Sequence, residues 1–301
     1  MESLTLTGFH VGMTDHAHTD STILVLGGTG KTGRRIVERL AARGVPTRVG
    51  SRSGEPPFDW EDRGTWEAAL RGVGAVYISY FPDLAIPGAA DTVGAFAELA
   101  VASGVRRQVL LSGRGEEEAE RAERLVRAAG GGCTILRATW FSQNFSESFM
   151  LDGVLAGALA LPVGDVREPF VDAEDIADVA LAALTEEGHA GRLYELTGPR
   201  LLTFADAVGE IAGATGRDVR LVPMTIDEFT SSLTEQHVPP DVVALLRFLF
   251  TEVLDGRNEK LTDGVRQALG REPRDFRDYA RETAATGVWA AELPASAARR
   301  E

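Results

Sequence analysis

From Thr22 onward, short apolar runs alternate with amphipathic segments along the first half of the chain. Continuous apolar runs of this length are typical of strands that are buried on both faces, and the amphipathic segments between them are typical of helices covering a parallel sheet. Apolar residues recur at helical spacing around Ile36 and around Phe96. The pattern predicts strands at residues 23–26, 47–49, 75–78, 108–111 and 133–136 in an α/β, Rossmann-type, doubly wound parallel sheet.

The second half of the chain is less regular. A helix at residues 176–183 and a strand at 193–196 are expected to return to the first sheet, and helical patterns dominate from Pro199 onward. One of these, at 242–250, is expected to be a mostly buried helix. We therefore predict a flexible arm at 1–20, a first domain at 21–150 to which 170–198 returns, and a smaller, mainly helical lobe made of 151–169 and 199–301. The two parts are expected to share a cleft, where ligands bind.

A glycine-rich turn lies directly between the first strand and the first helix. It consists of Gly27, Gly28, Thr29, Gly30, Lys31, Thr32 and Gly33. In this context Gly27 permits a tight turn, Gly30 lets the backbone approach a pyrophosphate, and Gly33 lets helix and strand pack closely. The turn predicts dinucleotide binding. It does not fit a nucleotide-triphosphatase loop, because the glycine that such a loop needs five positions before Gly30 is replaced by Val25.

The end of the second strand indicates which dinucleotide is bound. An acidic residue there would accept hydrogen bonds from the ribose of NAD, but the chain has Ser51, Arg52 and Ser53. A guanidinium and two hydroxyls suit a 2′-phosphate, so NADP(H) is favoured over NAD and the first domain is predicted to bind NADP. The alternative is that Arg52 simply faces solvent. Asp59 is a candidate for contact with the adenine, or an ordinary loop carboxylate.

A family resemblance adds to this picture. It rests on the glycine turn, on Ser51 to Ser53, and on two stretches, LRATWFSQNF at 136–145 and PFVDAEDIA at 169–177. Over roughly residues 22–290 the chain resembles the NmrA-like branch of the atypical short-chain dehydrogenases/reductases. That branch includes NADPH-dependent quinone and triphenylmethane-dye reductases, and also NADP(H)-sensing regulators. One departure is Ala138, where relatives commonly have proline.

The resemblance implies that the nicotinamide lies over the segments that follow strands three to five. These are residues 79–82, 112–114 and 139–144. On this basis Ser79 and Thr139 are expected to contact the cofactor, and Trp140, Phe141 and Asn144 to contact the substrate. For Trp140 and Phe141, as for Phe145, packing in the core is an equally good interpretation.

The usual catalytic pair of short-chain reductases is absent. That pair is a tyrosine four residues before a lysine, and no tyrosine of this chain has a lysine at that spacing. The remaining candidates for orienting a substrate are Tyr80, Ser112 and Gln143, which lie just beyond predicted strand ends. The resemblance places Glu123 near the missing lysine. However, favourable i,i+4 pairs such as Glu123 with Arg127 predict a surface helix joined by ion pairs instead.

Composition excludes several classes of function. The 31 basic against 45 acidic residues give a net charge of −14, which disfavours nucleic acid as a partner. The single cysteine, Cys133, fits a reducing compartment, and neither a membrane span nor a secretory signal is recognisable, so a cytoplasmic location is expected. Three histidines, at 10, 16 and 18, stand in the predicted arm, where they would bind metal only adventitiously, and no metal site is expected. The oligomeric state is left open between monomer and homodimer.

Together these features predict an enzyme that transfers hydride from NADPH to a small conjugated acceptor such as a quinone, an enone or a dye-like cation. Such acceptors suit a site without a dedicated strong acid, because positioning carries much of the catalysis. The alternative from another class is a non-catalytic NADP(H)-binding redox sensor that acts through a protein partner. An isomerase or lyase that retains its cofactor is a third possibility.

Overall fold

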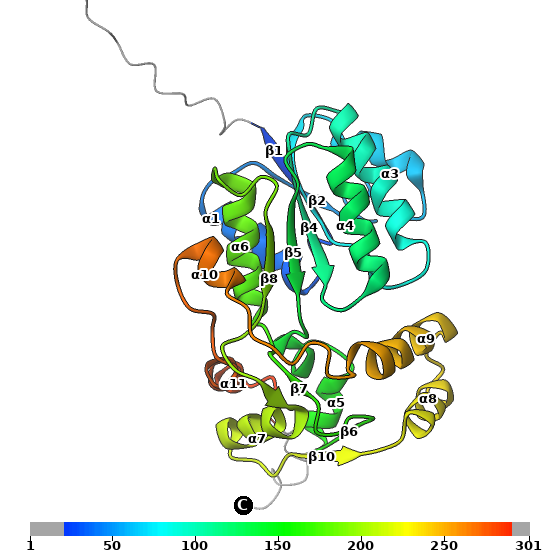
Figure 1. The fold of residues 1–301 in the computed structure, drawn as a ribbon, viewed down its shortest axis with the longest axis vertical. Helices are drawn as coiled ribbons and strands as arrows, with labels where there is room; N and C mark the ends of the chain where they lie inside the picture. The colour runs from blue at the N-terminus through cyan, green and yellow to red at the C-terminus, as the bar shows by residue number, and fades with distance from the viewer. Residues whose placement is uncertain (1–20, 291–301) are drawn as a thin grey trace, which may run out of the picture.

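A six-stranded parallel sheet forms the centre of the larger domain (Figure 1). The computed structural model describes residues 21–290, so the expected N-terminal arm, with its three histidines, and the last residues of the chain lie outside the described part. Along the sheet the order is β2-β1-β3-β4-β5-β8. The strands are β1 (Thr22–Leu26), β2 (Thr47–Gly50), β3 (Val73–Ile78), β4 (Arg107–Gly113), β5 (Thr134–Ala138) and β8 (Leu193–Leu196). The predicted Rossmann-type fold is confirmed, and β8 pairs with β5 at the edge of this sheet.

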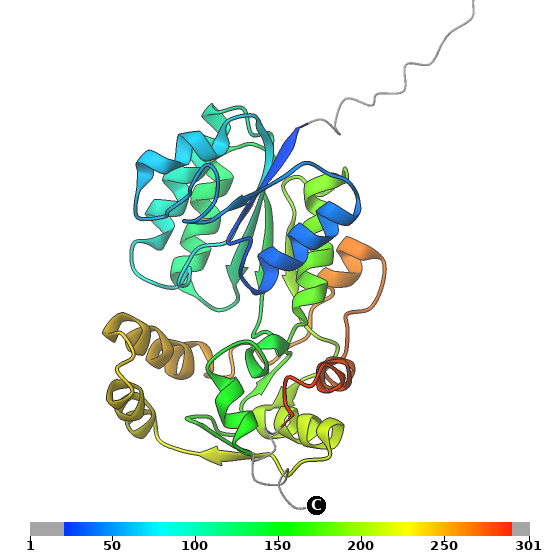
Figure 2. The same ribbon diagram turned by 180° about the vertical axis from the view of Figure 1, so that it is seen from behind.

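Helices cover both faces of the sheet, as the apolar runs required (Figures 1 and 2). One face carries α1 (Lys31–Ala42), α6 (Ala173–Thr185) and the short α10 (Gly264–Leu269). The other face carries α3 (Ala89–Ala102) and α4 (Glu117–Ala129), with the 3-10 turn η1 (Arg63–Thr65) and α2 (Trp66–Leu70) beside them. Central strands are buried on both faces, so two separate apolar cores form, one on each side of the sheet.

The smaller lobe is built from later segments and has its own aromatic core. Its helices are α5 (Met150–Leu155), α7 (Phe204–Thr215), α8 (Ile226–Glu235), α9 (Pro240–Phe248) and α11 (Phe276–Ala285). Its short strands are β6 (Ala158–Leu161) paired with β10 (Arg220–Pro223), and β7 (Arg167–Glu168) paired with β9 (Leu202–Thr203). The sequence did not indicate these strands, because each is only two to four residues long and none stands in a regular alternation with helices.

Local sequence explains where several lobe helices begin. At α7 and α8 a threonine caps the helix and an acidic side chain three residues later bonds back to it: Thr203 with Asp206, and Thr225 with Glu228. The expected helix at 242–250 is present as α9 and a following π turn, η3 (Leu249–Val253), but it is not mostly buried. Of α9 only Leu246 is buried, because a single face packs on the lobe and the rest meets solvent. Within residues 21–290 no helix has the length and apolar character needed to cross a bilayer.

Candidate functional site

The glycine-rich turn forms one end of a cleft between the two parts of the molecule. Gly27 has φ of +66°, which a side chain would strain, and a Cβ on Gly33 would lie 2.2 Å from the Gly27 carbonyl oxygen. At Gly30, in contrast, a Cβ would meet only that same oxygen, at 3.2 Å, and would otherwise extend into open space. Gly30 lines the cleft and directly precedes α1. The turn therefore leaves room for a phosphate group at the N-terminus of a helix.

The first residues of α1 are already tied into the site. Lys31 Nζ donates a hydrogen bond to Asn144 Oδ1 at 2.9 Å, and burial lowers the pKa of this lysine. The Tyr77 hydroxyl donates to Thr32 Oγ1 at 2.9 Å from inside the sheet. Lys31, Thr32 and Asn144 all line the cleft, whereas Gly28 and Thr29 are not among its lining residues. The first turn of α1 contains no acidic residue, so nothing in it opposes a bound anion.

The segment after β2 lies beside the turn, because β1 and β2 end together at Leu26 and Gly50. The Ser51 and Ser53 hydroxyls are 3.5 Å apart, and Arg52 is exposed. Among the described residues no carboxylate forms an ion pair with the Arg52 guanidinium. Asp59 lies outside the cleft lining, and its Oδ1 accepts a hydrogen bond from the backbone N–H of Glu61. This carboxylate therefore stabilises its own loop.

The cleft has a volume of about 330 Å³ and joins the turn to the segments that follow β3, β4 and β5. Its walls include Ser79, Tyr80, Ser112, Thr139 and the aromatic pair Trp140 and Phe141, and the lobe closes it with Leu249 and Val253 of η3. Trp140 packs in a core and also lines the cleft, and its contact with a substrate stays a prediction. Its ring packs against Phe204 and Phe250 of the lobe core, and the residue also lines the cleft. Phe145, which is fully buried, belongs to the core alone.

Tyr80 stands where the sequence placed it, at the end of β3. Its ring lies 5.0 Å from that of Trp60, and burial raises the pKa of its phenol. Aromatic packing thus fixes the ring while the residue still lines the cleft.

Ser112 and Glu123 differ from the expectation. Glu123 is buried, and two nitrogens of Arg137 donate to its carboxylate at 2.8 and 2.5 Å. The Ser112 hydroxyl donates to the same carboxylate at 2.6 Å. The predicted surface pair of Glu123 with Arg127 is wrong, because α4 turns Glu123 inward against β5, where it meets Arg137. Ser112 therefore uses its proton internally and faces a ligand mainly as an acceptor.

Gln143 also departs from its expected place. Its Nε2 donates to Asp172 Oδ1 at 2.7 Å and its Oε1 accepts from the backbone N–H of Ala173 at 2.7 Å, so both ends of the amide hold the start of α6. It is buried and does not line the cleft. The 3-10 turn η2 (Ser142–Phe145) explains why Gln143 points away from the cleft, because successive side chains of such a turn point in different directions. Of the four residues of η2, Asn144 alone lines the cleft. A substrate-orienting role for Gln143 is therefore not supported.

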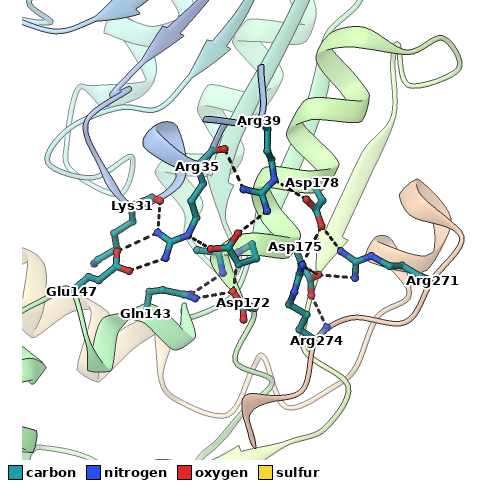
Figure 3. A network of polar contacts seen from close by, with 12 residues as sticks. Lys31, Arg35, Arg39, Gln143, Glu147, Asp172, Asp175, Asp178, Arg271 and Arg274 are labelled. Atoms are coloured by element: carbon teal, nitrogen blue, oxygen red, sulfur yellow. Dashed lines mark hydrogen bonds and ion pairs between the residues drawn. The ribbon is translucent and has the colours of Figure 1, made fainter. Parts of the chain in front are cut away.

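A network of ion pairs connects α1 to α6 and to Glu147, which follows η2 (Figure 3). Arg35 donates to Glu147 and Glu174, and Arg39 donates to Glu174 and Asp178. The network continues to the segment before α11, where Asp175, whose side chain is fully buried, pairs with Arg271 and Arg274. These contacts hold the backbone that carries Lys31 and Asn144.

Three acidic side chains near the cleft were missed at the level of sequence. Asp83 and Glu116 line it, from the loops after β3 and β4. Burial, followed by the charges of Asp83 and Glu123, raises the pKa of the Glu116 carboxyl well above its ordinary range, and burial raises that of Asp83. The position of Asp83 and Glu116 just beyond strand ends was the available signal, the same one that identified Tyr80. Glu168, on β7 of the lobe, had no such signal.

Comparison with known proteins identifies relatives of the whole chain. No protein-family model matches. The chain is 34% identical to agroclavine dehydrogenase of Claviceps fusiformis, over 89% of its length and 98% of that protein. It is 31% identical to a (4-alkanoyl-5-oxo-2,5-dihydrofuran-3-yl)methyl phosphate reductase of Streptomyces griseus, over 87% of its length and 98% of the relative.

Solved structures show the same fold at lower identity. The triphenylmethane reductase of Citrobacter sp. complexed with NADP(H) superposes with a TM-score of 0.70 at 19% identity, covering 87% of this chain and 99% of the other. NmrA, described as a negative transcriptional regulator, superposes with a TM-score of 0.67 at 18% identity, covering 91% and 98%.

Proposed function

Because this chain belongs to the NmrA-like branch of the atypical short-chain dehydrogenases/reductases, we propose that it is an NADPH-dependent oxidoreductase that reduces a small conjugated acceptor. The observation that carries the proposal is a single cleft lined at one end by Gly27, Gly30 and Lys31 and further along by Tyr80, Trp140 and Phe141. A phosphate-binding turn and an aromatic wall are what a dinucleotide and a flat, conjugated partner require. Several relatives are named as dehydrogenases or reductases, which supports the reaction class.

The cofactor side of the site consists of this chain's own groups in defined roles. The glycine turn from Gly27 to Gly33 and the N-terminus of α1 bind the pyrophosphate, and Ser51, Arg52 and Ser53 bind the 2′-phosphate. Ser79 and Thr139 lie where the nicotinamide ribose and ring would be. When bound, the reduced nicotinamide supplies a hydride, which is a proton together with two electrons.

The substrate side favours neutral or cationic acceptors. Tyr80 and Ser112 orient the acceptor, Trp140 and Phe141 form an aromatic wall, and Asn144 is held in place by Lys31. Asp83 and Glu116 line the same space: a carboxyl that is charged there favours a cationic acceptor, and one that is protonated can donate a hydrogen bond to a neutral acceptor. Quinones, enones and dye-like cations are therefore the proposed acceptors, and the segments 151–169 and 199–290 form the substrate lobe beside them.

The proposal is tested by NADPH oxidation with a panel of quinones, enones and cationic dyes, run with and without protein. We expect protein-dependent oxidation and stereospecific transfer of deuteride from labelled NADPH to at least one acceptor. Binding of NADPH without deuteride transfer to any member of the panel would instead indicate a redox sensor.

Replacement of Gly30 tests the cofactor site independently of any substrate. Gly30→Val should abolish NADPH binding, measured by fluorescence titration, and leave the melting temperature nearly unchanged, because its Cβ points into the cleft and not into the core. Gly164→Val is a matched control, since a Cβ there meets nothing within 4 Å, and it should bind NADPH normally. Normal binding by Gly30→Val would contradict the assignment of this turn.

A further inference from the structure

Thr139 links the cleft to a buried acid in the smaller lobe. It directly follows β5, it is almost fully buried, and it lines the cleft. Its hydroxyl donates to Glu168 Oε2 at 3.1 Å. Glu168 does not line the cleft, so Thr139 is the group through which this carboxyl reaches the ligand space.

Glu168 is an unusual residue to find in this position. It is 0% exposed on the two-residue strand β7, and its Oε1 has no hydrogen-bond partner among the described residues. A buried carboxylate that lacks partners is costly when charged. Accordingly, burial raises the pKa of Glu168 to about 7, against the opposing effects of the Thr139 hydrogen bond and the charge of Arg114.

The charged groups around Glu168 are few. Arg114, from the end of β4, favours the carboxylate, and Glu259 disfavours it. Arg114 Nη1 donates to the backbone oxygens of Asn258 and Lys260, its Nε is 3.8 Å from Glu195, and its buried Nη2 has no partner within residues 21–290. Glu259 accepts from the backbone N–H of Arg167. Arg114 can thus stabilise the charge that Glu168 acquires when it loses a proton.

We propose that Glu168 and Thr139 form a buried proton relay that delivers one proton to the anion left when hydride adds to a neutral acceptor. The inference rests on the proposed function and supplies the donor that the missing tyrosine and lysine would otherwise provide. It concerns proton transfer alone, and the residues act as a unit because only Thr139 touches the cleft.

The proton balance is simple. Hydride addition to a quinone or enone carbon shifts a π electron pair onto the carbonyl oxygen, which becomes an anion. That oxygen takes the Thr139 hydroxyl proton while Thr139 Oγ1 takes the proton of the Glu168 carboxyl. An O–H bond therefore forms at the substrate oxygen, one breaks and one forms at Thr139 Oγ1, and one breaks at the Glu168 carboxyl. Glu168 ends as a carboxylate that accepts from Thr139, which is the hydrogen bond observed. Solvent returns one proton through Thr139 when the product leaves.

The relay makes a prediction that depends on the acceptor. A neutral quinone needs a proton after hydride addition, whereas a cationic triphenylmethane dye is neutralised by the hydride itself and needs none. Glu168→Gln and Thr139→Val should therefore lower kcat for the quinone at least tenfold more than kcat for the dye, within the roughly 10²–10⁴-fold effect of a general acid. Thr139→Ser keeps the hydroxyl and should retain most quinone turnover. In the wild type, quinone turnover should fall as the pH rises through about 7.

A second measurement needs neither cofactor nor acceptor. Carbon-13 NMR of glutamate carboxyl groups should show a resonance titrating near pH 7 that Glu168→Gln removes and Glu116→Gln leaves in place. The titration would move upward in Thr139→Val, because the carboxylate loses the hydrogen bond that stabilises it.

Three results would overturn the relay. Equal losses of kcat for quinone and dye would indicate a structural role for Glu168 and Thr139. If no glutamate resonance that depends on Glu168 titrated between pH 6 and 8, Glu168 would have no proton to deliver in this range. An acceptor-dependent loss confined to Asp83→Asn or Glu116→Gln would assign the donor to the carboxyls that line the cleft. Folding of each variant is checked by its melting temperature. If the wild type reduces no acceptor at all, the proposed function itself fails. If the wild type is active but the variants lose the same share of turnover with both acceptors, only the relay fails.

Discussion

Two groups of charged side chains, one between α1 and α6 and one around the cleft, are built on opposite principles. Between α1 and α6 the arginines and carboxylates are paired: Arg35 and Arg39 bind Glu147, Glu174 and Asp178 (Figure 3). Around the cleft, charged groups are only partly paired within residues 21–290: Glu168 Oε1 accepts nothing, Arg114 Nη2 donates nothing, and Glu116 has repelling neighbours. The first group is typical of a network that stabilises the packing of helices, and the second is typical of a ligand-binding site.

The direction of the pKa shifts distinguishes the two groups. In the network, hydrogen bonds and charges from arginines overcome the effect of burial and lower the pKa of Glu147, Glu174 and Asp178. At the cleft, burial dominates and raises the pKa of Glu168, Glu116 and Asp83. The difference shows that burial of a carboxyl has no fixed consequence, because its partners decide which protonation state is stable.

The largest effect should come from breaking the paired group at its most buried point. Asp175→Asn leaves Arg271 and Arg274 facing an uncharged amide, and we expect a loss of about 3 kcal/mol in the free energy of unfolding, measured by denaturant titration. Asp227→Asn is the control, since its side chain is 82% exposed and, within the described part of the chain, pairs with Arg247 alone, and it should change stability by less than about 1 kcal/mol. Equal effects would show that the network does not stabilise this interface.

Glu168 should have the opposite effect on stability. Its folded pKa of about 7 exceeds its ordinary value of 4.5, so the folded state binds this proton more tightly and stability falls as the pH rises from about 4.5 to about 7. Glu168→Gln removes that loss and should raise the free energy of unfolding at pH 8.5 by up to about 3 kcal/mol more than at pH 4.5. In contrast, network carboxyls with lowered pKa lose their contribution as the pH falls below their ordinary range. A pH-independent effect of Glu168→Gln would contradict the raised pKa.

The smallest effect concerns Arg52, an exposed charge at the cofactor end of the cleft. Arg52→Ala should weaken NADPH binding roughly ten- to hundredfold, or about 1.5–3 kcal/mol, and leave NADH binding nearly unchanged, because only NADPH has the 2′-phosphate. Arg63→Ala, in η1, is the control and should alter neither affinity. Fluorescence titration measures both cofactors. If Arg52→Ala weakened both equally, the residue would not discriminate between them.

The central strands of the sheet could be predicted because they are buried enough to impose a continuous apolar run. β2 and β8 are only four residues long and partly exposed, and they were predicted from their place in the alternation of strands and helices. The same rule, that ligands lie beyond the carboxyl ends of parallel strands, placed Tyr80, Ser112 and Thr139 at the cleft. It failed for Gln143, because a 3-10 turn directs neighbouring side chains apart and no sequence pattern shows which one faces inward. Apolar patterns also failed to reveal the strands β6, β7, β9 and β10, whose pairing depends on partners distant in the chain.

The sequence by itself determined the sheet, the glycine turn and the absence of the usual tyrosine and lysine pair, since these depend on local composition and spacing. Tertiary structure alone decided which carboxyls are paired. Glu123 looked like a surface residue and is buried against Arg137, whereas Glu168, from a strand too short to recognise, is buried 3.1 Å from a cleft residue almost thirty positions earlier in the chain. The protonation state of a buried acid depends on its solvation and on the charges near it in space, and neither quantity is encoded by its neighbours in sequence.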